Sequence, residues 1–266
     1  MRFSAGNSEL MDFSLIITFA FALIIGISLG LLGGGGAILA VPVLTYITGM
    51  EPVQAIPSSL LIVGVTSIVS LILHALKKRV RWRTGVIFGL AAMVGAFVGG
   101  RVGAYVPAVI LMFSFAAVMI VAAVAMIRGR REQQHDNDEG EQLPIVKILI
   151  TGVVVGLVSG FVGAGGGFLI VPALALLARL PMTSAVATSL LVITMQSASG
   201  LAGYALSTSL DWALALSIAG VAVIGSFVGF WLSSKIPDRG LRKGFGVFVL
   251  AIAAVVVAEE TIQLLS

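Results

Sequence analysis

Residues 26–44 read Gly26-x-x-x-Gly30-x-x-Gly33-x-Gly35-Gly36-x-x-Leu39-x-Val41-Pro42-x-Leu44, where x stands for any residue. The same pattern returns 130 positions later (156 − 26) as Gly156-x-x-x-Gly160-x-x-Gly163-x-Gly165-Gly166-x-x-Leu169-x-Val171-Pro172-x-Leu174. The same offset, without an inserted or deleted residue, relates Trp82 to Trp212 and Pro107 to Pro237. Because chance does not preserve one register over this length, the chain is a duplicated unit with a glycine cluster near the start of each copy.

The composition is typical of a membrane protein. Hydrophobic residues form 59% of the chain and charged residues 11%, compared with about 25% charged residues in soluble proteins. Successive apolar runs of about 20 residues are long enough to cross about 30 Å of hydrocarbon as helices. The sequence therefore predicts an all-α integral membrane protein in a lipid bilayer. The bases behind the formal charge of +4 lie in short loops, where they set topology, so nucleic acid is not predicted as a partner.

Each copy is predicted to contain a glycine-broken helical hairpin followed by three transmembrane helices. The segments after the glycine clusters, 37–47 and 167–178, are only about 17 Å long as helices, too short to cross the membrane alone. They are interpreted as the second arms of hairpins that enter the membrane and return. The predicted organisation is a first transmembrane repeat at 13–127, a polar linker at 128–144 and a second transmembrane repeat at 145–264.

Loop charges predict that the two copies have opposite orientations. Loop 77–83 contains five bases and no acid, which favours the cytoplasmic side, whereas the equivalent loop 207–211 contains one acid and no base. The connection 235–243 contains four bases, whereas its equivalent 103–108 is uncharged. Equivalent loops therefore lie on opposite sides. This pattern predicts two inverted-topology repeats, with both termini outside and the linker 128–144 in the cytoplasm.

The glycine clusters are candidate binding elements. They match neither a phosphate-binding Walker loop nor a dinucleotide fingerprint. A helix that restarts after such a break presents unpaired N–H groups and a partial positive charge, which together form a cradle for an anion. The alternative is that these glycines only permit a bend or close helix packing, as the separately spaced Gly26 and Gly30 are expected to do. The predicted substrate-binding residues here are Gly33, Gly34, Gly35, Gly36, Ala37, Gly163, Gly165, Gly166 and Gly167.

Polar side chains in the spans after the hairpins supply the other predicted donors. They are Ser58, Ser59, Thr188, Ser189 and Gln196. The pairs Ser58-Ser59 and Thr188-Ser189 occupy equivalent positions in the two copies, and the amide of Gln196 is costly to place in lipid. The alternative for each hydroxyl is a hydrogen bond to the backbone of its own helix, four residues back.

No enzyme activity is predicted. The chain has two histidines and no cysteine, and no carboxylate lies centrally in a span. Neither a metal centre nor a hydrolytic triad can be assembled from these residues. We therefore predict no catalytic residue, no metal site and no cofactor.

The glycine clusters, their sequels Leu39-Ala40-Val41-Pro42 and Leu169-Ile170-Val171-Pro172, and the motifs Ser58-Ser59-Leu60 and Thr188-Ser189-Leu190 resemble the sulfite exporter TauE/SafE family of anion permeases. The resemblance covers residues 13–264. It implies transport of a sulfur-containing anion, such as sulfite, sulfoacetate or a related sulfonate. It also implies a multi-pass location in the plasma (inner) membrane of a prokaryote.

The predicted function is alternating-access transport of a small anion, held where the two glycine-broken hairpins meet near the middle of the bilayer. One alternative is a channel-like anion conductor that uses the same site. Another is a membrane scaffold or partner subunit without transport of its own. A permease for a cation is a further alternative, because broken helices also expose carbonyl groups, but the lack of central carboxylates weighs against it.

Overall fold

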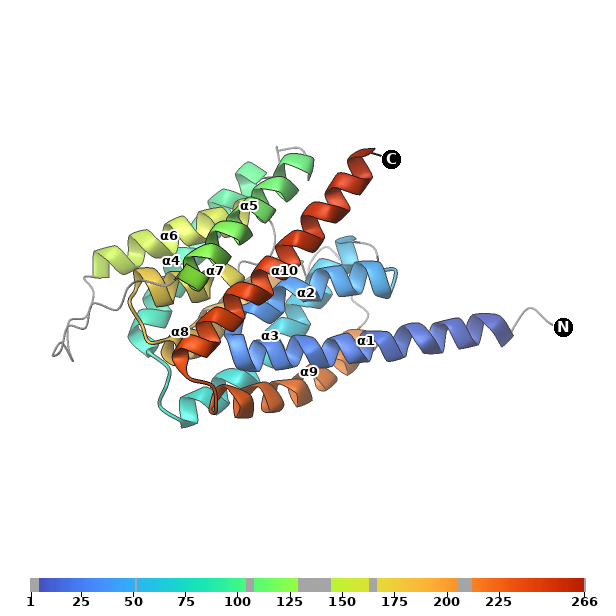
Figure 1. Ribbon diagram of the computed structural model, residues 1–266, viewed down its shortest axis with the longest axis horizontal. Coiled ribbons are helices and arrows are strands. Elements are labelled where there is room, and N and C mark those ends of the chain that lie inside the picture. The colour runs from blue at the N-terminus through green and yellow to red at the C-terminus, as the bar shows by residue number, and fades with distance from the viewer. Residues whose placement is uncertain are drawn as a thin grey trace.

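The computed structural model describes residues 5–50, 52–103, 108–128, 145–162, 167–204 and 212–265, which form helices and turns without a strand (Figure 1). The long helices are α1 (Ala5–Leu32), α3 (Pro52–Leu76), α4 (Trp82–Gly103), α5 (Ala108–Arg128), α6 (Ile145–Val162), α8 (Met182–Tyr204), α9 (Trp212–Ser233) and α10 (Asp238–Leu265). The short pieces are η1 (Gly33–Gly36), α2 (Ala37–Pro42), η2 (Val43–Ile47), α7 (Gly167–Pro172) and η3 (Ala173–Leu177).

The duplication in the sequence recurs in the helix boundaries. The tryptophans Trp82 and Trp212 begin α4 and α9, and their side chains are 54% and 53% exposed, as expected for anchors at a membrane surface. The predicted short arms are present as α2 with η2 and as α7 with η3. In both copies a turn of π-helix, η2 or η3, follows the proline that ends the short α-helix.

The chain is a multi-pass membrane protein. Six of the described helical segments are long and apolar enough to cross a bilayer: Ile16–Val41, Pro57–Leu76, Trp82–Gly99, Met182–Leu201, Trp212–Ser233 and Asp238–Ala258. Three further apolar segments are shorter: Ala116–Arg128, Ile145–Ser159 and Gly167–Leu177. Large apolar side chains face outward along the spans, among them Val94 at 62%, Val121 at 69% and Ile224 at 61% exposure. Such a surface requires lipid around it, which confirms the predicted all-α membrane fold.

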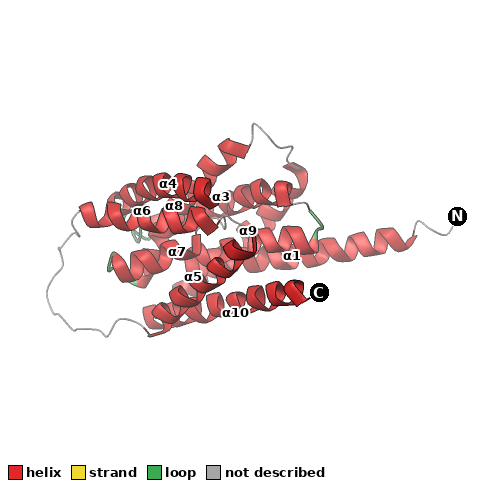
Figure 2. Cartoon of the chain, turned by 90° about the horizontal axis from the view of Figure 1, so that it is seen from above, coloured by secondary structure: helices red, strands yellow, loops and turns green. Residues whose placement is uncertain are grey.

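The two copies are interleaved. Helix α1 of the first copy packs along α9 of the second, and α4 of the first packs along α6 of the second. The equivalent helices pack against each other in the pairs α3 with α8 and α5 with α10 (Figures 1 and 2). The short arms of both copies contribute to one shared buried core, through Ala40 of α2, Ile170 of α7 and Leu174 of η3.

Glycines form the contact surfaces of the two interleaved pairs, as predicted from their spacing. A Cβ placed on Gly26 of α1 would lie 1.8 Å from the carbonyl oxygen of Ala222 in α9. A Cβ placed on Gly156 of α6 would lie 2.1 Å from the carbonyl oxygen of Ala92 in α4. Both helix pairs therefore touch backbone to backbone, which only glycine permits.

The contacts between helices also give their relative directions. Gly26 faces Ala222 and Gly30 faces Ser226, so α1 and α9 run parallel. In contrast, Gly64 of α3 faces Ser197 of α8, while Gly200 further along α8 faces back to Leu60 of α3. The equivalent helices α3 and α8 are therefore antiparallel.

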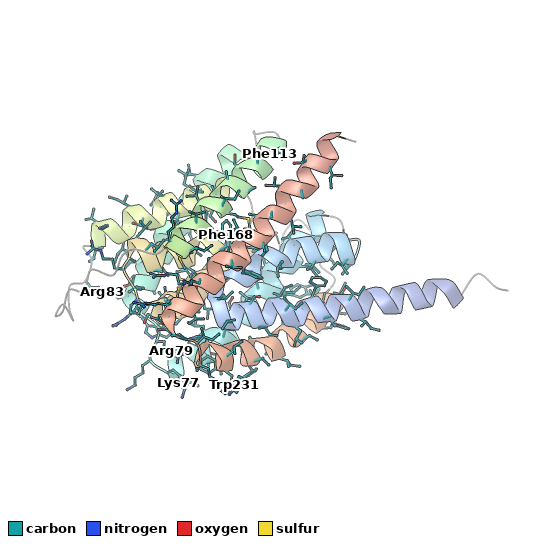
Figure 3. The ribbon with its side chains drawn as sticks, viewed as in Figure 1. Lys77, Arg79, Arg83, Phe113, Phe168 and Trp231 are labelled. Carbon is teal, nitrogen blue, oxygen red and sulfur yellow. The ribbon has the colours of Figure 1, made fainter. Side chains whose placement is uncertain are left out.

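The basic loops gather at one end of the molecule. Figure 3 shows Lys77, Arg79, Arg83 and Trp231 together at the end opposite to both termini. The ammonium group of Lys235 lies 3.7 Å from the centre of the Trp231 ring, so the 235–243 connection reaches the same end as loop 77–83. Basic side chains from both copies therefore lie at the same end of the molecule.

Candidate functional site

The first hairpin is formed by the break at the glycine cluster. Helix α1 ends at Leu32, and the next residue, Gly33, has a φ of +67°, which a residue with a side chain rarely adopts. The chain then folds back on itself, because a Cβ on Gly36 would lie 2.5 Å from the carbonyl oxygen of Ile25 in α1. The second arm, α2 with η2, therefore lies directly against the last turns of α1.

The tip of this hairpin contacts the tip of the second hairpin. A Cβ on Gly34 would lie 1.6 Å from the carbonyl oxygen of Gly167, the first residue of α7. All four residues of η1 are buried, and so is Gly167. The structure thus brings the predicted site residues of both copies, Gly33 to Gly36 and Gly167, into contact. The other predicted residues of the second cluster, Gly163, Gly165 and Gly166, lie outside the described residues.

Ser189 lies at the same junction. A Cβ on Gly33 would lie 2.5 Å from its Oγ, so a side chain of the second copy covers the break of the first. Ser189 is fully buried, and its hydroxyl donates a hydrogen bond to the carbonyl oxygen of Val186 at 2.8 Å. We call the group formed by η1, Gly167 and Ser189 the glycine junction.

The other predicted hydroxyls have different environments. Ser58 donates to the carbonyl oxygen of Gln54, four residues back in its own helix, at 2.8 Å. This is the hydrogen bond expected for a hydroxyl that only satisfies its own helix. The Thr188 hydroxyl accepts a hydrogen bond from the backbone N–H of Arg81 at 3.1 Å, so it faces the start of α4. Ser59 is buried in α3 at the position equivalent to Ser189. Gln196 is half-buried and follows Ser189 by two turns on the same face of α8.

The glycine junction is closed in this structure. The N–H of Ala37, one of the predicted donors, is engaged by the carbonyl oxygen of Gly34. Gly33 and Gly34 have no room for even a methyl group, whereas a Cβ on Gly35 would lie in ordinary contact, at 3.5 Å, with Phe245 and Phe248. An anion that binds among these residues must therefore separate the two hairpin tips.

The interpretation of the sequence missed His74. Its side chain is 1% exposed, and its Nε2 lies 3.3 Å from the carbonyl oxygen of Gly30. That carbonyl belongs to the last turn of α1, where carbonyl groups lose their intrahelical partners. His74 therefore supplies a hydrogen-bond partner to the carbonyl group of Gly30, which lies three residues before the break at Gly33. The signal in the sequence was the spacing of Ser67, Ser70 and His74, which places them on one face of a span.

Metal binding finds no support in the part of the chain that the structure describes, since no group of three or more His, Asp or Glu side chains there could hold an ion. The polar side chains of the predicted site are hydroxyls and one amide, and His74 adds an imidazole at the end of α1. These are groups that donate hydrogen bonds to a negatively charged ligand.

Known proteins similar to this chain are membrane transporters. The family model "Sulfite exporter TauE/SafE" matches residues 18–256. A "Probable membrane transporter protein" of Xylella fastidiosa is 36% identical over 248 residues, covering 92% of this chain and 95% of its own length. A "Probable membrane transporter protein" of Methanocaldococcus jannaschii is 28% identical over 251 residues, covering 87% of this chain and 92% of its own length.

A "Sulfite exporter TauE/SafE family protein 3" of Arabidopsis thaliana is 28% identical over 132 residues, covering 48% of this chain and 28% of its own length. No solved structure matches the chain. The family model spans both copies and both hairpins, so the relationship covers the whole arrangement described above. The chain belongs to the sulfite exporter TauE/SafE family of membrane transporters.

Proposed function

We propose that this protein is an alternating-access permease for a small anion, and that the anion is sulfite, sulfoacetate or a related sulfonate. The observation that carries the proposal is the contact between two glycine-broken hairpins, Gly34 against Gly167, inside a protein of this transporter family. The site comprises the glycine clusters with Ala37, the hydroxyls of Ser59 and Ser189, and Gln196. The neighbouring hydroxyls of Ser58 and Thr188 complete the proposed site; in the closed arrangement Ser58 donates to the backbone of Gln54 and Thr188 accepts from the backbone of Arg81.

The packing supports a specific mode of movement. The parallel pairs α1 with α9 and α4 with α6 each join helices of both copies through backbone contacts at glycines, so each pair moves as one body. In each copy the broken element follows one helix of a pair along the chain: η1 follows α1, and α7 is the next described helix after α6. Rocking one pair against the other about the antiparallel α3 and α8 separates the tips first toward one side and then toward the other.

Flux through reconstituted vesicles tests this function. Proteoliposomes loaded with sulfite, sulfoacetate or a carboxylate of similar size are expected to show saturable flux and counterflow of the sulfur anions. Flux without saturation or counterflow supports the channel-like conductor instead. Absence of flux for every anion contradicts both and favours a scaffold. As an independent readout, a bound anion at 100 times its Kd stabilises the folded protein by about 2.7 kcal/mol, which raises its unfolding temperature.

We also propose that the two copies are inverted repeats in the plasma membrane of a prokaryote, with both termini outside and the linker 128–144 in the cytoplasm. The antiparallel packing of the equivalent helices α3 and α8 supports the inversion. The location of loop 77–83 and connection 235–243 at one end supports the orientation, because basic loops face the cytoplasm.

Labelling of single introduced cysteines tests the orientation of the chain in the membrane. The wild-type chain contains no cysteine, so only the introduced residue can react. The variant Asn7→Cys is expected to react with a membrane-impermeant maleimide in intact cells. The variant Asn137→Cys, in the linker, is expected to react only after the membrane is permeabilised. The reverse pattern contradicts the proposed orientation, and labelling of both sites in intact cells contradicts the inversion of the repeats.

A further inference from the structure

A row of buried polar atoms on α3 lacks hydrogen-bond partners. The hydroxyls of Ser67 and Ser70 and the Nδ1 of His74 have no partner among the described residues. The exposed fractions of these three side chains are 0%, 0% and 1%. Burial of such groups costs folding free energy unless a ligand or water supplies the missing hydrogen bond. The row therefore requires hydrogen-bonding partners that the described residues do not supply.

Arg79 extends this row to the basic end of the molecule. Its Nη1 is buried and has neither a carboxylate nor any other hydrogen-bond partner among the described residues. Its guanidinium carbon lies 5.9 Å from the centre of the Phe230 ring, and the His74 ring meets the same ring edge-on at 4.9 Å between centres. The backbone N–H of Arg79 also donates to the carbonyl oxygen of His74 at 3.2 Å. The imidazole ring of His74 and the guanidinium group of Arg79 therefore both lie against one aromatic side chain of α9, that of Phe230.

The chemistry of these two groups selects the ligand. The carbonyl oxygen of Gly30 only accepts hydrogen bonds, so the Nε2 of His74 carries the proton in their 3.3 Å bond. The remaining Nδ1 accepts a hydrogen bond when the ring is neutral and donates one when it is charged. Arg79 is a permanent cation that matches oxyanions. A small oxyanion that itself carries one exchangeable proton satisfies both groups in either state of the ring.

We propose that His74 and Arg79, with the Phe230 ring as their common wall, form a second binding position for a small oxyanion such as hydrogen sulfite, between the basic loop and the glycine junction. This inference rests on the proposed function, because it places the position on the route of a transported anion. The hydroxyls of Ser70 and Ser67 continue the row inward. The bond from His74 to Gly30 connects the position to the broken end of α1.

The first test compares two variants that each remove one positive charge from the same loop. The side chain of Lys77 is exposed, whereas the Nη1 of Arg79 is buried. Calorimetric titration of the purified full chain with sodium sulfite is expected to give a Kd at least about tenfold higher for Arg79→Gln, because a charge-assisted hydrogen bond is lost. Lys77→Gln is expected to change the Kd by less than about twofold, because an exposed charge is screened. Equal effects of the two variants overturn the proposal.

The second test separates the two nitrogens of His74. In His74→Gln the side-chain amide nitrogen lies near the position of Nε2 and keeps the bond to Gly30, so we expect a stable protein with sulfite affinity at least about tenfold weaker. In His74→Asn the carboxamide group lies near the position of Nδ1 and can accept or donate the same hydrogen bond, whereas the bond to Gly30 is lost, so we expect retained affinity and a lower unfolding temperature. Retained affinity in His74→Gln overturns the proposal.

The wild-type protein distinguishes failure of this proposal from failure of the proposed function. If the wild-type protein neither binds nor transports any anion, both are wrong. If it transports sulfite normally and the His74→Gln and Arg79→Gln variants bind sulfite as tightly as the wild type, only the second binding position is wrong.

Discussion

Gly34→Ala is expected to abolish anion flux and to lower the yield of folded protein. The added methyl carbon would lie 1.6 Å from the carbonyl oxygen of Gly167 and 2.2 Å from its carbonyl carbon. Both atoms belong to the backbone of the other hairpin, so they cannot rotate away as a side chain does. Forcing extra volume into a packed interior costs about 1–3 kcal/mol when side chains can adjust, and more where the backbone must move. The measurement is flux per folded protein in vesicles, with the unfolding temperature alongside.

Gly35→Ala is the matched control for this effect. It makes the same chemical change one residue away in the same buried 3₁₀ turn. Its methyl group would lie 3.5 Å from Phe245 and Phe248, which is ordinary contact, so the unfolding temperature and the yield of folded protein should stay near those of the wild type. Wild-type behaviour of Gly34→Ala would show that the hairpin tips do not touch in the folded protein.

The sequence predicted the elements of this fold because the signals for them are local. Helix-length apolar runs are interrupted by four consecutive glycines in one copy and by the matching cluster in the other. Each break predicts a short arm that follows it and returns toward the same side of the membrane. The structure confirms the arm 37–47 in its bounds. The packing partner of each helix was not predicted, because glycine spacing identifies the face of a helix that makes close contacts but not the helix that packs against it. The pairing of α1 with α9 is therefore a finding of the structure.

The structure brings some of the predicted site residues together and separates others, for a reason that lies in helix geometry. Thr188 and Ser189 are neighbours in sequence, but successive residues of a helix point about 100° apart. Ser189 faces the glycine junction, and Thr188 faces the backbone of Arg81. The occurrence of such a pair in both copies does not indicate which of the two hydroxyls faces the glycine junction and which faces another helix. The role of His74 was missed because its partner, the carbonyl of Gly30, becomes available only through the break at Gly33 in another helix.

Gly26→Ala is expected to separate α1 from α9 and to reduce both stability and transport. The added methyl carbon would lie 1.8 Å from the carbonyl oxygen of Ala222, so the two helices must move apart along their contact. Gly220→Ala is the matched control, because nothing lies within 4 Å of the added carbon and the residue is in the same helix pair. That variant is expected to be neutral or more stable by up to about 1 kcal/mol, since alanine favours a helix over glycine. Thermal unfolding of the two purified variants compares these effects.

The double variant of Gly26 and Gly225 tests whether α1 and α9 move as one body. A Cβ on Gly225 would lie 2.4 Å from the carbonyl oxygen of Leu23, so the two glycines interlock across one contact. A single outward shift of α9 makes room for both methyl groups. The loss of stability in Gly26→Ala with Gly225→Ala should therefore be smaller than the sum of the single losses, by about 0.5–3 kcal/mol as found for residues in contact. Additive losses would mean that each glycine is accommodated separately, which is incompatible with a rigid pair that carries the first hairpin during transport.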